Sequence, residues 1–495
     1  MRERSALWNE GDDPVKPNHK RLLEDARDLD RADRREEALL AYRRFLAVEP
    51  RDAGGWADYG GLLLVSGQLQ SAEEACKRAL QIERGHPSAL LNLGCALMQL
   101  DHLQEAEGYM RQVLARDPQR MDARLALVDC LIRRADLEPA EKLLMKAIAQ
   151  EPGNPSAHQF LGHIFHRLGR WPELQAEIER YLRIDPGSTY VEYERGFLDL
   201  LFGDLSRGWR LYEARFKVPG LVGPTRQFTQ PRWEGQPFAG HTLLLHYEQG
   251  FGDTIMFVRF APQVKALGGR VLLAAQASLA ELVATCPGVD EVIPHGLPLP
   301  PFDLQLPLLS LPLVLHTTLD TIPAEIPYLD LPVQVPNREA IAEVLAASEG
   351  KTRVGLVWAG SSIHKNDRVR SLPTEALAPL GLIPGVAWHS FQLGMAMEAP
   401  LPGIVSLAPL LSNFSDTAYA LSGMDLVITV DTVLAHLAGA LGIPTLLMIP
   451  YSPDWRWLLD REDSPWYPTM RIYRQPEPGD WQGIIQKLLG DLTGA

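Results

Sequence analysis

The sequence predicts a solenoid of paired helices followed by two α/β lobes that are each built on a parallel sheet. Three observations support this fold class. The first half repeats small residues every 34 positions, and the second half alternates short apolar runs with helical patterns. In addition, residues 425–444 combine a buried strand, a tight turn, a helix and a second strand, which is typical of a βαβ unit.

Three ladders of residues share the 34-residue period in the first half. The first ladder is Ala38, Ala72, Ala106 and Ala140, and Leu174 is its next member. The second is Gly60, Gly94, Gly162 and Gly196, with Val128 in place of the glycine at the one remaining position. The third is Pro50, Pro118, Pro152 and Pro186, with Arg84 in place of the proline at one position. The small residue lets the two helices of a unit approach each other, and the proline ends the second helix. We expect repeats at about 19–52, 53–86, 87–120, 121–154 and 155–188, and a degenerate sixth unit at about 189–216.

Composition limits the class of protein. With 46% apolar and 22% charged side chains, the 495 residues describe a globular chain with large cores, and a net charge of −14 argues against nucleic acid as a general partner. The four cysteines form no CxxC pair, so neither a disulfide framework nor a zinc site is expected. We find no signal peptide, and the apolar tract Leu297–His316 contains five prolines, which argues against a membrane span. These features favour a cytoplasmic protein.

The second half alternates strands and helices after a linker at Gly220–Pro237. In the first lobe we expect strands at His241–Tyr247, Val271–Ala275, Glu291–Pro294 and Phe302–Leu306, and helices at Asp253–Leu267 and Ser278–Thr285. In the second lobe we expect strands at Arg353–Trp358, Val386–Gln392, Leu426–Val430, Thr445–Ile449 and Met470–Tyr473, and helices at Pro373–Leu382, Asp416–Ser422, Leu434–Leu441 and Trp481–Leu492. The expected domains are a flexible lead at 1–17, a helical array at 18–188, joining helices at 189–219, a first lobe at 220–330 and a second lobe at 331–495.

The turn after Leu426–Val430 is the first candidate site. Asp431 and Thr432 precede a helix, so unpaired N–H groups and the positive end of the helix dipole meet the carboxyl end of a strand, which suits a phosphate. His436 lies one helical turn further on. The alternative is an ordinary βαβ unit without a ligand.

A second candidate lies in the first lobe, where Gly250 and Gly252 allow close backbone approach. Asp253 is placed to act as a general base on an acceptor hydroxyl, although it would also serve as an N-cap, and Glu248 is the competing carboxylate. The segment is not a complete GxGxxG, so it is weak evidence for a dinucleotide.

Two further loops of the second lobe could bind a ligand. Residues 358–371 concentrate hydrogen-bond donors and cations, as a diphosphate requires, namely Ser361, Ser362, His364, Lys365, Asn366, Arg368 and Arg370. The alternative is a solvated basic loop. Residues 450–468 interleave Trp455 and Trp457 with Asp454 and Arg456, and these rings, together with Gln392, could stack on a base or sugar or simply be core residues. We find no metal-ligand motif and no GxSxG, so no metal and no cofactor are expected.

These motifs resemble known families. Residues 19–216 resemble tetratricopeptide repeats (TPR). Residues 240–490 resemble a GT-B glycosyltransferase of family 9, the heptosyltransferase type, through Gly252-Asp253-Thr254 and through the run from Asp431 to Ala438 that continues to Pro444. The resemblance implies two Rossmann-like lobes, a metal-independent inverting reaction and Asp253 as catalytic base. It also implies that Asp431, Thr432 and His436 bind the donor sugar and its pyrophosphate, with Lys365 on a phosphate. Val433 departs from the family, which usually has Gly there.

The whole chain is similar to bacterial repeat-fused glycosyltransferases, and its layout is similar to that of O-GlcNAc transferases and of repeat-bearing flagellin glycosyltransferases. The resemblance implies transfer of a sugar from a nucleotide-activated donor of unknown nucleotide to a hydroxyl of a protein, such as a flagellin-like acceptor, that the TPR groove recruits. The alternatives are a heptosyltransferase-like enzyme acting on lipopolysaccharide or polysaccharide, and a non-catalytic TPR adaptor with a decayed transferase half. The array could also serve as a scaffold or form a homo-oligomer.

Overall fold

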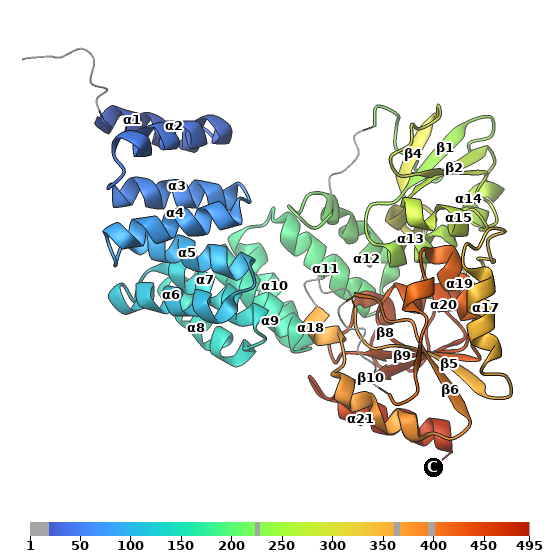
Figure 1. Cartoon of the computed structure of the whole chain (residues 1–495). Coiled ribbons are helices and arrows are strands. Elements are labelled where there is room, and N and C mark those ends of the chain that lie inside the picture. Colours follow the sequence, from blue (N-terminus) through green and yellow to red (C-terminus); the bar gives the residue numbers. More distant parts are fainter. Residues whose placement is uncertain (1–18, 223–227, 361–366, 395–400, 495) are drawn as a thin grey trace, which may run out of the picture. The chain divides into compact units, whose positions relative to one another are not determined.

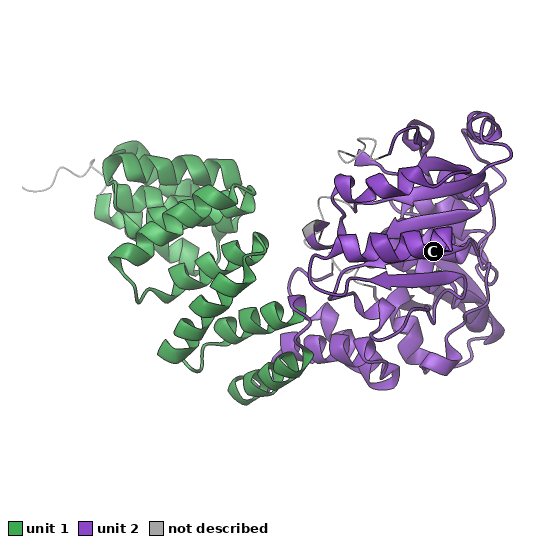
Figure 2. Cartoon of the chain, turned by 90° about the horizontal axis from the view of Figure 1, so that it is seen from below, with its two compact units in different colours: residues 1–166, 171–185 green, residues 167–170, 186–495 purple. Residues whose placement is uncertain are grey.

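The computed structural model describes residues 19–222, 228–360, 367–394 and 401–494 (Figure 1). The chain divides into two compact units, one of residues 1–166 and 171–185 and one of residues 167–170 and 186–495, which Figure 2 colours separately. Within the described ranges, no helix combines the length and the apolar character that a membrane crossing requires.

Paired helices joined by short turns make up the N-terminal region. They are α1 (His19–Arg31), α2 (Arg35–Val48), α3 (Ala53–Val65), α4 (Leu69–Ile82), α5 (Pro87–Gln99), α6 (Leu103–Arg116), α7 (Met121–Arg133), α8 (Leu137–Gln150), α9 (Pro155–Arg167) and α10 (Trp171–Ile184). The first helix of each pair begins 34 residues after that of the preceding pair. The predicted solenoid of paired helices is therefore confirmed.

The two ladders of small residues face each other inside the pairs. Ala38, Ala72, Ala106 and Ala140 are all fully buried on the second helices. On the first helices, a Cβ added at Gly60 would lie 2.5 Å from the Sγ of Cys76, and one added at Gly94 would lie 3.2 Å from the Cγ of Met110. The helices of a pair approach each other closely because these positions lack larger side chains.

The turns between repeats contain a fourth ladder that the sequence analysis did not detect. Trp56 Nε1 donates to the carbonyl of Pro50 at 3.0 Å, His158 Nε2 bonds to that of Pro152 at 2.9 Å, and Arg124 donates to that of Pro118. In the repeat with Arg84 in place of the proline, the corresponding side chain is the apolar Leu90. A polar side chain thus satisfies the carbonyl of the proline that ends the preceding repeat.

The sixth helical pair belongs to the second compact unit. It consists of α11 (Thr189–Leu201) and α12 (Leu205–Tyr212), followed by the 3-10 helix η1 (Glu213–Phe216). A Cβ added at Gly196 would lie 2.6 Å from the backbone nitrogen of Tyr212, so α11 and α12 are in direct backbone contact.

The first α/β lobe contains a four-stranded parallel sheet in the order β3-β2-β1-β4. Its strands are β1 (Thr242–His246), β2 (Arg270–Ala275), β3 (Glu291–Pro294) and β4 (Leu304–Pro307). The single helix predicted at 253–267 was wrong, because the structure has α13 (Phe251–Val258) and then α14 (Ala261–Ala266), with Pro262 in the first turn of α14. Likewise, the helix predicted at 278–285 is the 3-10 helix η2 (Ala277–Leu279) and the short α15 (Ala280–Val283).

The second lobe contains a six-stranded parallel sheet in the order β10-β9-β8-β5-β6-β7. Its strands are β5 (Thr352–Val357), β6 (Val386–Ser390), β7 (Val405–Ser406), β8 (Leu426–Val430), β9 (Thr445–Ile449) and β10 (Met470–Arg474). The strand order reverses direction between β5 and β8, so this pair forms the topological switch point of the sheet, outside which ligands bind in open α/β sheets.

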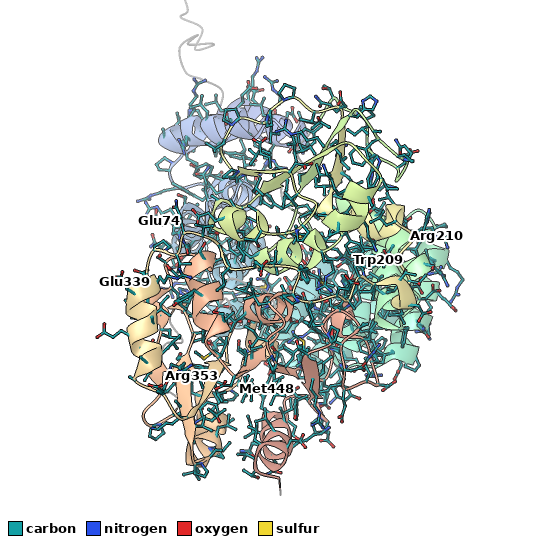
Figure 3. All side chains as sticks on the ribbon, turned by 90° about the vertical axis from the view of Figure 1, so that its right-hand side faces the viewer. Glu74, Trp209, Arg210, Glu339, Arg353 and Met448 are labelled. Carbon is teal, nitrogen blue, oxygen red and sulfur yellow. The ribbon has the colours of Figure 1, made fainter. Side chains whose placement is uncertain are left out.

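The helices of the second lobe differ from the prediction at three places. The segment η5 (Thr374–Leu382) is a 3-10 helix, because Pro379 lacks the N–H that an α-helix needs. The helix α17 (Arg338–Ala346) was not predicted, and its Glu339 side chain points outward (Figure 3). The short helix α18 (Asp367–Arg370) was not predicted either, whereas α19 (Phe414–Ser422), α20 (Val433–Ala440) and α21 (Trp481–Thr493) correspond to predicted helices. The helix α16 (Leu311–Val314) belongs to the first lobe.

Candidate functional site

The turn between β8 and α20 has the geometry that the sequence predicts. Thr432 is the N-cap of α20, and its Oγ1 accepts a hydrogen bond from the backbone N–H of Leu434 at 3.3 Å. The turn follows β8 at the switch point, beside the carboxyl end of β5. The N-terminus of α20 is therefore directed to the position where an open parallel sheet characteristically binds its ligand.

Charged groups from two other segments surround Asp431. Burial raises the pKa of this carboxyl to about 6 and the neighbouring Asp454 adds to the rise, whereas Arg370 and Arg456 oppose it. Arg370, which follows β5 in sequence, donates to the backbone carbonyl of Asp431 at 3.2 Å. The structure thus brings the end of the predicted donor-rich loop to the predicted phosphate turn.

His436 lies between the two lobes and is buried. Its Nδ1 is 2.9 Å from the hydroxyl of Tyr467, and its ring stacks on Trp457 with centroids 5.4 Å apart. Burial first, and then the charges of Arg456 and Arg259, hold its pKa well below the usual value, so the imidazole is neutral at neutral pH. A Cβ added at Gly252 would lie 2.7 Å from its Cδ2, so the glycine permits α13 to approach α20.

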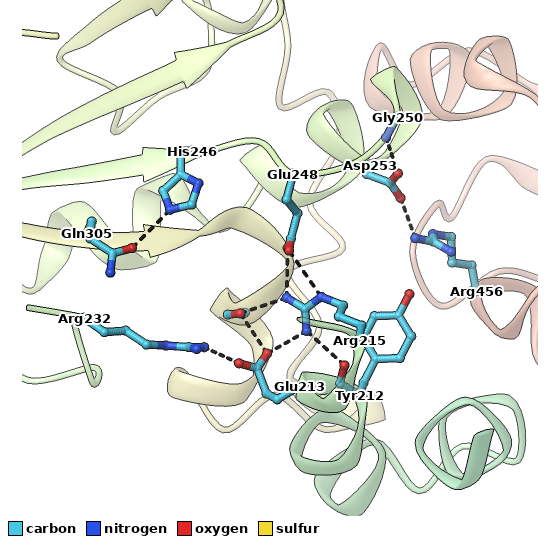
Figure 4. Close-up of polar contacts among 11 residues, drawn as sticks. Tyr212, Glu213, Arg215, Arg232, His246, Glu248, Gly250, Asp253, Gln305 and Arg456 are labelled. Carbon is cyan, nitrogen blue, oxygen red and sulfur yellow. Dashed lines mark hydrogen bonds and ion pairs between the residues drawn. The ribbon is translucent and has the colours of Figure 1, made fainter. Parts of the chain in front are cut away.

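Asp253 is held from both lobes. Its Oδ2 accepts a hydrogen bond from the N–H of Gly250 at 2.9 Å, and its Oδ1 forms an ion pair with Arg456 (Figure 4). The interpretation of Asp253 as an N-cap was wrong, because Gly250 is the N-cap and Asp253 is the third residue of α13. Arg456 also binds Asp454 at 2.7 Å and lies over the ring of Trp455 at 4.2 Å. The pair with Asp253 could not be found from sequence, since 203 residues separate its members.

Glu248 is engaged in a different network. Arg215 of η1 donates to it at 2.8 and 3.3 Å and to Ser310 Oγ at 2.9 Å, and it also pairs with Glu213 (Figure 4). Because Glu248 follows β1 and Ser310 follows β4, Arg215 occupies the switch point of the first sheet. Burial raises the pKa of Glu248, and Arg215 opposes that rise. The sequence analysis missed Arg215 because no motif surrounds it.

The remaining predicted residues have structural roles in this conformation. Trp455 and Trp457 are buried, with the Trp455 ring 5.2 Å from that of Trp209, as the alternative of core residues expects; stacking on a base or sugar stays a prediction. Gln392 is buried and accepts from the N–H groups of Trp358 at 3.2 Å and Ala359 at 2.9 Å. Thr254 donates to Gln276 Oε1 at 2.9 Å.

Part of the predicted site lies outside the described residues. This applies to Ser361, Ser362, His364, Lys365 and Asn366, and to the side chain of Arg368. In the part of the chain that the structure describes, no group of three or more His, Cys, Asp or Glu side chains is arranged to hold a metal ion.

Comparisons with known proteins bear on the helical region. Residues 22–109 match the family model of the middle TPR-like domain of cilia and flagella-associated protein 70, and residues 97–164 match a tetratricopeptide repeat model. Two similar solved structures are a tetratricopeptide repeat protein from Parabacteroides merdae (19% identity, covering 41% of this chain and 79% of that one, TM-score 0.37) and PilW, a type IV pilus biogenesis factor (18%, 41% and 93%, TM-score 0.37). The two family models together identify residues 22–164 as tetratricopeptide repeats, a module that characteristically mediates protein–protein interaction.

One curated protein is similar over a longer stretch. Protein FlbA of Caulobacter vibrioides is 27% identical over 363 residues, which cover 66% of this chain and 60% of FlbA. The chain thus spans somewhat less than two thirds of the length of this relative.

Proposed function

We propose that the chain is a metal-independent, inverting glycosyltransferase of the GT-B type. In this proposal it moves a sugar from a nucleotide-activated donor to a hydroxyl of a protein that the repeat array holds. The observation that carries the proposal is the contact of α13 with α20. It places Asp253 of the first lobe and the Asp431–Thr432 turn of the second around a single arginine, Arg456.

The donor diphosphate would bind at the switch point between β5 and β8. The N-terminus of α20 and Thr432 supply hydrogen-bond donors there, and Arg370 supplies a positive charge. Lys365, Arg368, Ser361 and Ser362 belong to the same loop in sequence. Neutralising the charge that develops on the leaving diphosphate is the step that needs most electrostatic help in such a transfer. No cofactor other than the nucleotide-sugar substrate is required.

Asp253 is the better of the two candidate bases. Glu248 is bound twice by Arg215, and only 6% of its side chain is accessible, so an acceptor hydroxyl reaches it less readily. Asp253 stands at the contact between the lobes and remains partly exposed, with 16% of its side chain accessible. We therefore assign the acceptor proton to Asp253. The repeat array would raise the local concentration of the acceptor through contacts remote from the reacting atoms.

A non-catalytic TPR adaptor is the second candidate, and one observation favours it. Both carboxylate oxygens of Asp253 are already engaged, and the rings of Trp455 and Trp457 are buried.

A transferase acting on lipopolysaccharide or polysaccharide would use the same donor site and differ in its acceptor. Donor binding separates either transferase from the adaptor, and the identity of the acceptor separates the two transferases. We place the reaction in the cytoplasm because the cysteine pattern fits a reducing compartment.

The substitution Asp253→Asn tests the assigned base. It should abolish transfer of a labelled sugar while leaving calorimetric binding of the nucleotide within about twofold, because the amide retains the shape but cannot accept a proton. Asp320→Asn is the matched control, since it makes the same chemical change at an exposed carboxylate of the first lobe. If Asp253→Asn turns over substrate as fast as the Asp320→Asn control, Asp253 is not the base.

A further inference from the structure

Tyr212 is the last residue of α12 and reaches the contact between the lobes. Its side chain is buried, with 4% of the residue exposed. The ring packs 5.8 Å from that of Trp455 and 5.5 Å from that of Tyr193, and the guanidinium of Arg215 lies 5.1 Å above it. The position of the ring is thus set by contacts on several sides, and the hydroxyl is the only polar group of the side chain.

The hydroxyl of Tyr212 points toward Arg456, the residue that binds Asp253 (Figure 4). Among the described side chains and backbone groups, none makes a hydrogen bond with this hydroxyl, although Arg215 donates to the backbone carbonyl of the same residue at 3.2 Å. In the described part of the chain, this hydroxyl is not one of the side-chain atoms that are both fully buried and without a hydrogen-bond partner, so it is open to solvent although the ring is buried. A ligand that binds beside Asp253 would take the place of that solvent and accept a hydrogen bond from the hydroxyl.

The electrostatic surroundings place the hydroxyl at the same group of charges. Burial raises the pKa of Tyr212, with Asp454 and Asp253 adding to the rise, and Arg456 and Arg215 oppose it. The phenol therefore stays protonated at neutral pH and is able to donate a hydrogen bond.

Tyr212 is fixed relative to the first lobe. Arg215, three residues further along, anchors η1 to Glu248 and Ser310 at the ends of β1 and β4. In the proposed function the first lobe presents Asp253 to the acceptor, so a ligand oxygen near Tyr212 would belong to the acceptor rather than to the nucleotide.

We propose that Tyr212 is a ligand-contacting residue that the sixth helical pair adds to the site, and that it donates a hydrogen bond to an oxygen of the hydroxyl-bearing acceptor beside Asp253. The inference rests on the proposed transferase function and extends it. If Tyr212 contacts the acceptor, the acceptor site of the α/β lobes is incomplete without α11 and α12. This gives a functional reason why the pair belongs to the same compact unit as the lobes.

The experiment compares the full chain with Tyr212→Phe, which keeps the ring and removes the hydroxyl. We expect kcat/KM for the acceptor to fall about tenfold, as the loss of one hydrogen bond to a neutral group predicts. Nucleotide affinity by calorimetry and the melting temperature should stay unchanged. Tyr473→Phe is the control, because it removes a hydroxyl that donates to Asp491 at 2.7 Å on the second lobe, and it should leave kcat/KM unchanged.

The outcomes separate this inference from the function on which it rests. If kcat/KM is unchanged in Tyr212→Phe, the side chain is a packing residue and the inference is overturned. If only nucleotide affinity falls, the acceptor contact is wrong. If the unmodified chain neither binds a nucleotide nor transfers a sugar, the proposed function itself has failed, and the role of Tyr212 fails with it.

Discussion

Arg456 forms an ion pair that joins the two lobes. It pairs with Asp253 on one side and with Asp454 on the other, and only 9% of its side chain is exposed. Burial would lower its pKa, but the two carboxylates raise it well above the usual value, so the guanidinium is always charged. Arg456 is therefore a positioning residue for the carboxylate that the proposed reaction uses.

Removing the charge of Arg456 should destabilise the α/β unit. Arg456→Gln leaves two carboxylates without their counter-ion, and we expect the free energy of unfolding to fall by about 3 kcal/mol. Arg456→Lys should recover part of that loss because it keeps the charge but not the planar fork. Denaturant unfolding measures both variants. If Arg456→Gln unfolds at the same denaturant concentration as the unmodified chain, the ion pairs of Arg456 contribute nothing to stability.

Asp431 predicts a pH dependence of stability. Its carboxyl has a pKa of about 6 in the folded chain against 3.8 for an unperturbed group, so folding favours the protonated form. The resulting stabilisation is present below pH 3.8 and is lost as the pH rises through about 6. Asp431→Asn does not titrate, so its stability relative to the unmodified chain should be higher at about pH 7.5 than at about pH 4.5. If the difference in unfolding free energy between Asp431→Asn and the unmodified chain is the same at both pH values, the raised pKa of Asp431 is contradicted.

Sequence analysis located part of the residue-scale picture. The start of a helix after Asp431 and Thr432 could be predicted because the signals that begin a helix are local in sequence, and the buried alanine ladder could be predicted because it repeats. The partners of Asp253 and Glu248 could not be predicted. They lie 203 and 33 residues away, in segments without a motif, and their pairing depends on how separate elements pack.

At the scale of elements, glycines decide how closely helices pack. Gly196 and Gly162 occupy equivalent rungs of one ladder, but their surroundings differ. A Cβ at Gly196 would meet the backbone of Leu211 and Tyr212 at 2.6 to 2.8 Å, whereas a Cβ at Gly162 would meet only the Cδ1 of Leu174 at 3.4 Å. The first contact requires the helices to separate, and the second is an ordinary contact.

Alanine at these two glycines should therefore have opposite effects. Gly196→Ala should lower the stability of the α/β unit by about 2 kcal/mol because it forces α11 and α12 apart. Gly162→Ala should be neutral or stabilising by up to about 1 kcal/mol, because alanine favours a helix over glycine. Scanning calorimetry of both variants measures the difference. Equal melting temperatures for the two would contradict the packing described here.

Most strands could be predicted from short apolar runs, whereas several helices could not. Proline explains two of these failures, since Pro262 lies in the first turn of a separate α14 and Pro379 leaves a 3-10 helix where an α-helix was expected. The missed helix α17 follows a proline-rich stretch that was interpreted as a connection between the lobes. The strand order of either sheet, and with it the switch point, depends on contacts that a single sequence does not contain.

At the scale of the whole molecule, the boundary between units predicts which truncations fold. A chain that begins at residue 186 retains Trp209 and Arg215, which pack on the two lobes, and should unfold cooperatively. A chain that begins at residue 217 loses both residues and should be unfolded or aggregated, because Glu248 would lose its buried counter-ion. Circular dichroism and gel filtration of the two truncations test this. A folded chain from residue 217 would show that the sixth pair is not part of the α/β unit.

The same truncation separates recruitment from chemistry. In the proposed function, the chain from residue 186 should bind the nucleotide as tightly as the full chain but lose most turnover on a protein acceptor, because the repeat array is absent. Parallel calorimetry and transfer assays measure the two properties. Unchanged turnover on the protein would contradict a recruiting role for the array.

Nucleotide binding by the full chain tests the central claim most directly. We would record the melting temperature of the purified chain with ADP, UDP, GDP and CMP, each with and without magnesium. A ligand at about 100 times its dissociation constant stabilises the folded state by about 2.7 kcal/mol. The account predicts a clear increase with one nucleotide that magnesium does not change. No increase with any of the four would contradict a donor site between β5 and β8 and would favour the adaptor.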